Sequence, residues 1–171
     1  MAETAIVVLI PELESLLGEP RRRYTGDGAR GMPTHVTLIF PFADSSEVDA
    51  RLTVIARMLG AFAPFELTFS ETARFPGFLY LRPEPARPFV AMTEALAAAF
   101  PDFPPYGEEF DEIVPHVTVA RADEGVLAAL ESELAPRLPA KARVERGWLV
   151  ENTSGRWRRH TAFPLDRHTR V

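Results

Sequence analysis

The strongest constraint on how this chain can fold is a short segment that it contains twice. HVTLIF, at residues 35–40, has a near-copy in HVTVAR, at residues 116–121. Each copy closely follows a proline, reads as a strand, and precedes a segment whose apolar residues have helical spacing. Two of the chain's four histidines therefore stand in the same tripeptide, His-Val-Thr. The recurrence of this tripeptide with its context predicts two related halves, each with one copy on a strand.

Strand geometry divides each copy into two faces. Because side chains alternate along a strand, His35 and Thr37 share one face, about 7 Å apart, while Val36 points to the other face. His116 and Thr118 are arranged in the same way. If a pseudo-two-fold axis relates the halves, the two polar faces meet across a cleft that holds two imidazoles and two hydroxyls.

Such a tetrad suits proton transfer at a phosphate. One neutral imidazole can take a proton while a protonated one gives a proton, and the ordinary histidine pKa near 6.5 keeps both forms accessible. Threonine hydroxyls can donate hydrogen bonds to phosphate oxygens. The repeated histidines are not in a ligand-spaced cluster, so no metal site is predicted. The other two histidines, His160 and His168, are expected to be exposed.

The remaining sequence predicts one α+β domain over residues 1–171, with two lobes. Strands are expected over residues 4–10, 35–40, 64–70, 78–83 and 116–121, followed by a hairpin over residues 141–165. Helices are expected over residues 45–60, 89–100 and 126–134, the first capped by Ser45 or Ser46. Residues 20–33 and 101–115 read as loops.

Composition narrows the classes of function. The absence of cysteine removes disulfides, thiol nucleophiles and thiolate metal sites, and it suits a reducing compartment. The N-terminus has no basic leader, and Pro11 interrupts its apolar run, so we expect a cytoplasmic protein. A net charge of −5 argues against extended electrostatic binding to nucleic-acid backbones. The arginine clusters at residues 21–23 and 156–159 are expected in a solvated loop and on a solvated strand face.

The two His-Val-Thr segments, in this order and spacing, resemble the paired H-x-[ST] signature of the 2H phosphoesterase superfamily, in its 2'-5' RNA ligase-like branch. FPF at residues 40–42, FLYLRPEP at residues 78–85 and the closing hairpin are similar to that branch as well. The resemblance implies a bilobal α+β fold. Its duplicated antiparallel sheets, related by a pseudo-two-fold and flanked by helices, would enclose a central cleft that holds both motifs.

The function that this resemblance implies is a metal-independent phosphodiesterase. It would open 2',3'-cyclic phosphates, or cleave or form 2'-5' linkages of RNA or nucleotides, with His35 and His116 as the acid/base pair and Thr37 and Thr118 as phosphate binders. The expected partner is a nucleotide or RNA terminus, with no cofactor, no membrane and no obligate protein partner, and we expect a monomer. The alternative is a non-catalytic module that holds a nucleotide or RNA end in the same cleft. The substrate, and which histidine is base or acid, stay open.

Four further residues are candidates for substrate contacts. The family often has an arginine five places after the second histidine, and Arg121 matches it. Strict alternation would aim Arg121 away from the cleft, so this role requires a bulge or a strand end. Phe40 is the equivalent residue in the first copy, where it could stack on a base or pack in the core. Tyr24 and Arg30, in the segment before the first motif, could cap the cleft.

Overall fold

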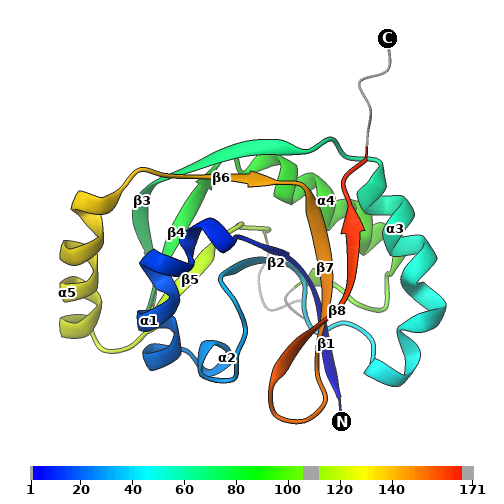
Figure 1. Cartoon of the computed structure of the whole chain (residues 1–171), viewed down its shortest axis with the longest axis horizontal. Helices are drawn as coiled ribbons and strands as arrows, with labels where there is room; N and C mark the ends of the chain where they lie inside the picture. Colours follow the sequence, from blue (N-terminus) through cyan, green and yellow to red (C-terminus); the bar gives the residue numbers. More distant parts are fainter. Residues whose placement is uncertain (1, 106–111, 167–171) are drawn as a thin grey trace.

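Two antiparallel sheets form the frame of the protein (Figure 1). The computed structural model describes residues 2–105 and 112–166. Over these residues the first sheet has the order β2-β1-β7-β8, from β1 (Glu3–Leu9), β2 (His35–Ile39), β7 (Arg146–Asn152) and β8 (Trp157–Pro164). The second sheet has the order β5-β4-β3-β6, from β3 (Phe65–Phe75), β4 (Phe78–Glu84), β5 (Val117–Arg121) and β6 (Ala140–Val144). The predicted α+β fold with duplicated antiparallel sheets is confirmed.

Helices flank both sheets. They are α1 (Glu14–Tyr24), α2 (Gly26–Ala29), α3 (Leu52–Gly60), α4 (Arg87–Ala99) and α5 (Glu124–Leu134). In α4, Phe89, Met92 and Leu96 recur at helical spacing and are fully buried, as their period predicted. The side chain of Asp123 caps α5 by accepting a hydrogen bond from Val126 N. Within the described part of the chain, no helix is both long and apolar enough to cross a membrane.

The two halves repeat one unit and interlock. In each unit a strand, a helix and the motif strand follow one another, as β1-α1-β2 and as β4-α4-β5, and the two strands pair antiparallel. Both motif strands, β2 and β5, lie at an edge of their sheets, and they contact each other across the junction between the sheets. Helix α1 packs against β5, and α4 packs against β2. Each connecting helix thus supports the motif strand of the other half.

Both faces of the first sheet are buried, and each face contacts a different apolar cluster. Ile6, Val8 and Leu149 point into the main hydrophobic core, which the helices and the second sheet share. Ala5 and Val7 alternate with them and belong to a second, smaller apolar cluster on the opposite face. Thr37 pairs directly with Val7, so this opposite face is also the face of the first motif.

The prediction of a loop over residues 20–33 is wrong for most of this segment. Residues 20–24 complete α1, and residues 26–29 form α2. The buried side of α1 includes Leu13 just before it, then Leu16, Leu17, Pro20 and Arg21, which is helical spacing. Because a proline and an arginine occupy two of these buried positions, the helical spacing of apolar residues cannot be recognised in the sequence. Thr25 ends α1 and caps α2 by accepting a hydrogen bond from Gly28 N.

The predicted element bounds need smaller corrections. The segment expected as a helix from residue 45 begins with two 3-10 turns, Ser45–Glu47 and Asp49–Arg51, and Asp44 rather than a serine provides the cap. β3 extends to Phe75, so only Pro76 and Gly77 separate it from β4. The positive φ of 83° at Gly77 favours glycine in that turn. Residues 106–111 of the second predicted loop, and His168, lie outside the described residues.

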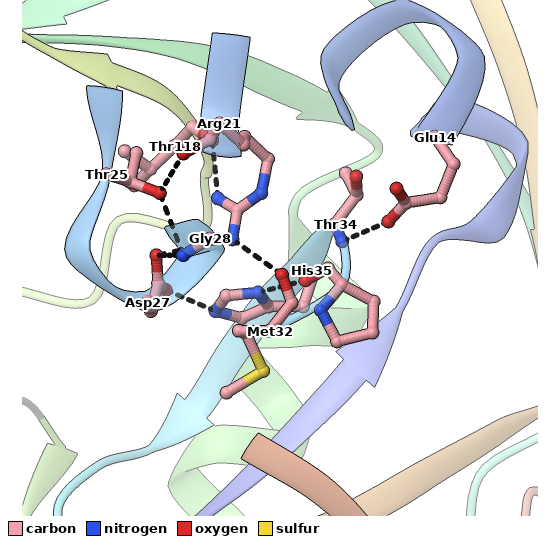
Figure 2. A network of polar contacts seen from close by, with 10 residues as sticks. Glu14, Arg21, Thr25, Asp27, Gly28, Met32, Thr34, His35 and Thr118 are labelled. Atoms are coloured by element: carbon pink, nitrogen blue, oxygen red, sulfur yellow. Dashed lines mark hydrogen bonds and ion pairs between the residues drawn. The ribbon is translucent and has the colours of Figure 1, made fainter. Parts of the chain in front are cut away.

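Arg21 joins α1 to both motif segments, although its cluster was predicted to be solvated. Its side chain is 2% exposed. Nη1 donates to Thr118 O at 2.8 Å, and Nη2 lies 3.3 Å from both Met32 O and the Asp27 carboxylate, as Figure 2 shows. The bonds connect residues up to 97 positions apart, from the first helix to the second motif strand.

We therefore expect Arg21→Met to lower the free energy of unfolding by about 3–5 kcal/mol, because the change leaves the buried carbonyl of Met32, the part-buried carbonyl of Thr118 and the carboxylate of Asp27 without this donor. Arg22→Met is the matched control, since Arg22 is exposed on the same helix. Urea denaturation of both variants measures the difference. A loss for Arg21→Met no larger than that for Arg22→Met would contradict the role of the buried guanidinium.

Candidate functional site

The two motif strands carry the same irregularity at the same place. In the first sheet Thr37 pairs with Val7 and Ile39 pairs with Ile6, so one extra residue lies between the pairs on β2. In the second sheet Thr118 pairs with Tyr80 and Ala120 pairs with Leu79, which leaves one extra residue on β5. A β-bulge therefore follows the threonine in both copies. The duplication extends to the detail of backbone pairing, and it gives both motifs one geometry.

Both histidines are held by the same backbone contact. His35 Nδ1 lies 2.7 Å from Pro33 O, and His116 Nδ1 lies 2.6 Å from Val114 O. A carbonyl can only accept, so Nδ1 donates in each case and the proton of the neutral ring is assigned to that nitrogen. The neutral form then has its lone pair on Nε2. Nε2 of each ring is then the nitrogen at which a proton could be taken or given, which is the chemistry that the predicted acid/base role requires.

His35 lies in a buried, charged environment (Figure 2). Burial and, to a smaller extent, the charge of Arg21 lower its pKa to about 4, while the carboxylate of Asp27 opposes the shift. Asp27 Oδ2 lies 3.8 Å from Nε2 of His35, so it would pair with a protonated ring. Burial also opposes ionisation of Asp27, but His35, Arg21 and hydrogen bonds from Thr25 and Gly28 hold its pKa below the ordinary value.

Gly28 keeps the turn around Asp27 tight. A Cβ at this position would lie 2.4 Å from the backbone carbonyl oxygen of Arg21, which no side chain can tolerate. The amide of Gly28 donates to Asp27 Oδ1 at 2.7 Å and to Thr25 Oγ1 at 2.9 Å. The close approach of α1 and α2 therefore places Asp27 between Arg21 and His35.

His116 lies among aromatic rings. The rings of Phe75 and Tyr80 meet it edge-on, with centroids 5.4 and 5.5 Å away, and the centroid of Phe78 is 6.4 Å away. Burial lowers the pKa of His116, and its bond to the carbonyl of Val114 opposes that shift. A charge on His116 would also lower the pKa of His35, so the two imidazoles are close enough to interact electrostatically.

Arg121 lies beyond a bulge and at a strand end, which is the condition under which its side chain was expected to face the cleft. It ends β5, beyond the bulge, and pairs with Phe78. Its guanidinium lies 5.3 Å from the centroid of the Phe78 ring, on the strand face where Phe78 and Tyr80 contact His116. The bulge thus returns Arg121 to the face of Thr118, and its side chain is exposed there.

The other three candidates lie in different places. Phe40 is half-buried in the small apolar cluster on the face of the first motif, with an edge contact to Trp157. Tyr24 is half-buried against the main core, under the guanidinium of Arg23. Arg30 is exposed, and its carbonyl accepts from Trp157 N at 2.9 Å. Of the three, only Phe40 belongs to the apolar cluster on the face of Thr37, because Tyr24 packs against the main core on the other side of the sheet.

Sequence reasoning missed Arg21 and Asp27. The one signal that could have indicated Arg21 is its position, because it falls on the buried side of a helix that Leu13, Leu16 and Leu17 define. Nothing in the local sequence marks Asp27, because its position beside His35 depends on how α1 and α2 meet.

The depressed pKa of His35 makes stability depend on pH. The unfolded chain binds a proton at this histidine near pH 6.5, and the folded chain binds it only near pH 4. The contribution of neutral His35 to the free energy of unfolding is therefore fully present above pH 6.5. It is lost as the pH falls from 6.5 to 4, and the loss amounts to about 3 kcal/mol. We expect His35→Gln to remove that share of the pH dependence, as measured by urea denaturation at a series of pH values. His160→Gln, at an exposed position of β8, should keep the wild-type slope. Equal slopes for wild type and His35→Gln would refute the prediction.

Comparisons with known proteins agree with this architecture. The sequence profile of the 2'-5' RNA ligase superfamily matches residues 10–156. The fold is similar to TT0787 of Thermus thermophilus, with a TM-score of 0.66 at 20% identity over 96% of this chain and 98% of that one. It is also similar to E. coli LigT complexed with 3'-AMP, with a TM-score of 0.64 at 16% identity over 97% and 99% of the two chains. A further similar structure, described as a phosphoesterase, has a TM-score of 0.61 at 18% identity over 98% and 100%. No curated protein sequence matches the chain.

The profile match spans most of the chain, and it includes both His-Val-Thr segments, their bulged strands and the helices that support them. The likeness to LigT and to the phosphoesterase extends over nearly the full length of each chain. This protein belongs to the 2'-5' RNA ligase superfamily.

Proposed function

We propose that this protein is a two-histidine phosphodiesterase that opens 2',3'-cyclic phosphates, or cleaves or forms 2'-5' linkages, at a nucleotide or RNA terminus. The observation that carries the proposal is the pair of equally bulged motif strands at the facing edges of two sheets. Family membership supports phosphodiester chemistry, and a LigT structure holds 3'-AMP, a nucleotide with a 3'-phosphate. Both tetrad halves, His35 with Thr37 and His116 with Thr118, are complete.

The proton transfers can be written with the chain's own groups. For a cyclic phosphate, one neutral imidazole takes a proton from water at Nε2 as the water oxygen forms its bond to phosphorus. The bond from phosphorus to one ribose oxygen breaks, and the second histidine, as imidazolium, gives its proton to that oxygen. The threonine hydroxyls donate to the non-bridging oxygens. A 5'-hydroxyl in place of water gives a 2'-5' linkage when the 3'-oxygen leaves, so the same groups serve ligation.

We infer that Asp27 makes His35 the proton donor when substrate is bound, although burial and Arg21 lower the pKa of this histidine to about 4 in the free protein. Its carboxylate lies 3.8 Å from Nε2 of His35 and stabilises the imidazolium form. Arg21 acts against the imidazolium, but it also pairs with Asp27 and keeps this carboxylate ionised. In the proposed reaction the base is then His116.

The first test is hydrolysis by purified, folded protein in the presence of chelator. We expect turnover of at least one substrate among 2',3'-cyclic nucleotides, 2'-5' linked dinucleotides and RNA that ends in a cyclic phosphate. His35→Ala and His116→Ala should each lower kcat by about 10²–10⁴-fold, because each removes one proton transfer. Thr37→Val and Thr118→Val should lower it by about 10²-fold by removing a donor to the phosphate.

His160→Ala is the control for the histidine variants, since it is exposed on β8. No turnover of any substrate, or full activity in His35→Ala, would refute the phosphodiesterase. Tight nucleotide binding without product would instead favour the binding module.

The second test assigns the two roles. Asp27→Asn should lower the pKa of His35 by removing the carboxylate beside Nε2. The profile to measure is kcat against pH, which reports the substrate-bound enzyme, and its limb that falls at high pH should move to lower pH. Asp49→Asn is the matched control, because Asp49 is 87% exposed, with His160 as its nearby histidine. If the limb that rises from low pH moves instead, His35 is the base and the assignment is reversed.

A further inference from the structure

The face of the first motif continues without a break across three strands. Thr37 on β2 pairs with Val7 on β1, and Val7 pairs with Trp148 on β7, so the three side chains share one face. Neighbouring strands lie about 4.8 Å apart, which places Trp148 about 10 Å from Thr37. Val150 and its partner Arg159 on β8 extend the same face. The sheet face that carries the first motif therefore continues to β7 and β8, where Trp148 and Arg159 reach solvent.

This part of the face is hollowed and rich in arginine. Three hollows meet at Arg159, and together they are lined by exposed arginines of α1, β6, β7 and β8. Arg143 and Arg146 line the hollow that Trp148 borders, and Arg158 lines the one that Trp157 borders. Glu12, Glu14 and Glu145 also line the hollows. Glu12 and Glu14 accept hydrogen bonds from the backbone amides of Arg143 and Thr34, so part of their charge is already engaged.

Aromatic platforms accompany the positive charge. Both tryptophans of the chain, Trp148 and Trp157, are half-buried on this face in the small apolar cluster. The guanidinium of Arg159 lies 5.4 Å from the centroid of the Trp148 ring. Residues 5 and 7 of β1, alanine and valine, are buried at 2% and 0% exposure in a cluster with Met32, against which Phe40 and both tryptophans pack, so apolar side chains cover the strip between the first motif and the tryptophans. The corresponding residues of β4 are Phe78 and Tyr80, which fill that position beside His116.

We propose that the surface formed by Arg146, Trp148, Trp157 and Arg159 binds single-stranded RNA whose reacting end lies in the candidate site. Guanidinium groups bind phosphates bidentately, and tryptophan rings stack on bases of any sequence. A mononucleotide at Thr37 has no second phosphate to reach Arg159, so the surface serves a longer strand. A stacked single strand also fits a chain with net charge −5 better than a duplex does, because a duplex requires a broad positive face.

This proposal rests on the proposed function for the position of the RNA end, but its test needs no turnover. The probes are oligoadenylates of one, two, four and six nucleotides with a 3'-phosphate, and tryptophan fluorescence and anisotropy report binding. We expect affinity to rise by about tenfold or more between one and four nucleotides, since each stacked base adds binding energy. His35→Ala should keep this gain.

Arg159→Gln and Arg146→Gln should remove most of the gain with length, and each should lower the salt dependence of binding by about one released counterion. Binding and turnover of a mononucleotide should stay unchanged, because neither arginine belongs to the tetrad. Arg137→Gln, at an exposed position outside this surface, is the matched control. Trp148→Leu should also remove most of the gain in affinity with length. If this substitution of a half-buried residue unfolds the chain, the two arginine variants still test the proposal.

The outcomes separate the two proposals. Length-dependent binding that requires Arg159, without turnover of any substrate, supports the RNA surface and refutes the phosphodiesterase. Turnover of mononucleotides with no gain from added nucleotides overturns the RNA surface and leaves the phosphodiesterase intact. Competition by an acidic peptide that equals that of the oligoadenylate would overturn RNA as the occupant.

Discussion

The buried guanidinium of Arg21 is the interaction on which the geometry of the site depends. A cation in the interior is costly to desolvate unless its donors are all engaged, and Arg21 engages the second motif strand, the segment before the first motif, and Asp27. Its planar shape fixes the directions of these bonds, so it sets how the two motif segments lie relative to each other. Burial lowers the pKa of His35 the most, and the charge of Arg21 lowers it further. One residue thus links the position of the first histidine to its proton affinity.

The duplicated units share a backbone but differ in what surrounds the motif. Both bulges follow the threonine, yet Val7 lies opposite Thr37 where Tyr80 lies opposite Thr118. Large rings on β4 enclose His116, whereas the smaller Ala5 and Val7 on β1 are buried in the apolar cluster that Trp148 and Trp157 border. A symmetric frame therefore carries an asymmetric site. Such asymmetry suits a substrate with two different sides, one at the reacting phosphate and one along a strand.

Local periodicity explains which parts of this structure could be predicted from sequence. The motif strands, α4 and α5 follow clear periods of 2 or 3.6, and the bulge at Arg121 was inferred as a condition for its role. Helix α1 could not be predicted, because Pro20 and Arg21 stand where apolar residues would reveal it. The bond from Arg21 to Thr118 spans 97 positions, and only packing brings such residues together. The face shared by Thr37 and Trp148 likewise depends on a register across three strands, which no local pattern encodes.

Burial of both histidines links proton transfer to binding. Burial lowers both pKa values below the ordinary value of 6.5, so at neutral pH the free protein holds two neutral imidazoles. The proposed reaction needs one proton on the pair, and a bound phosphate diester supplies the negative charge that favours it. In the proposed reaction, Asp27, which stays ionised beside Nε2 of His35, then favours this ring as the one that receives the proton. In this arrangement the free protein lacks a ready acid, and the acid forms when the anionic substrate binds. The same burial that weakens the fold at low pH would thus restrict catalysis to the occupied site.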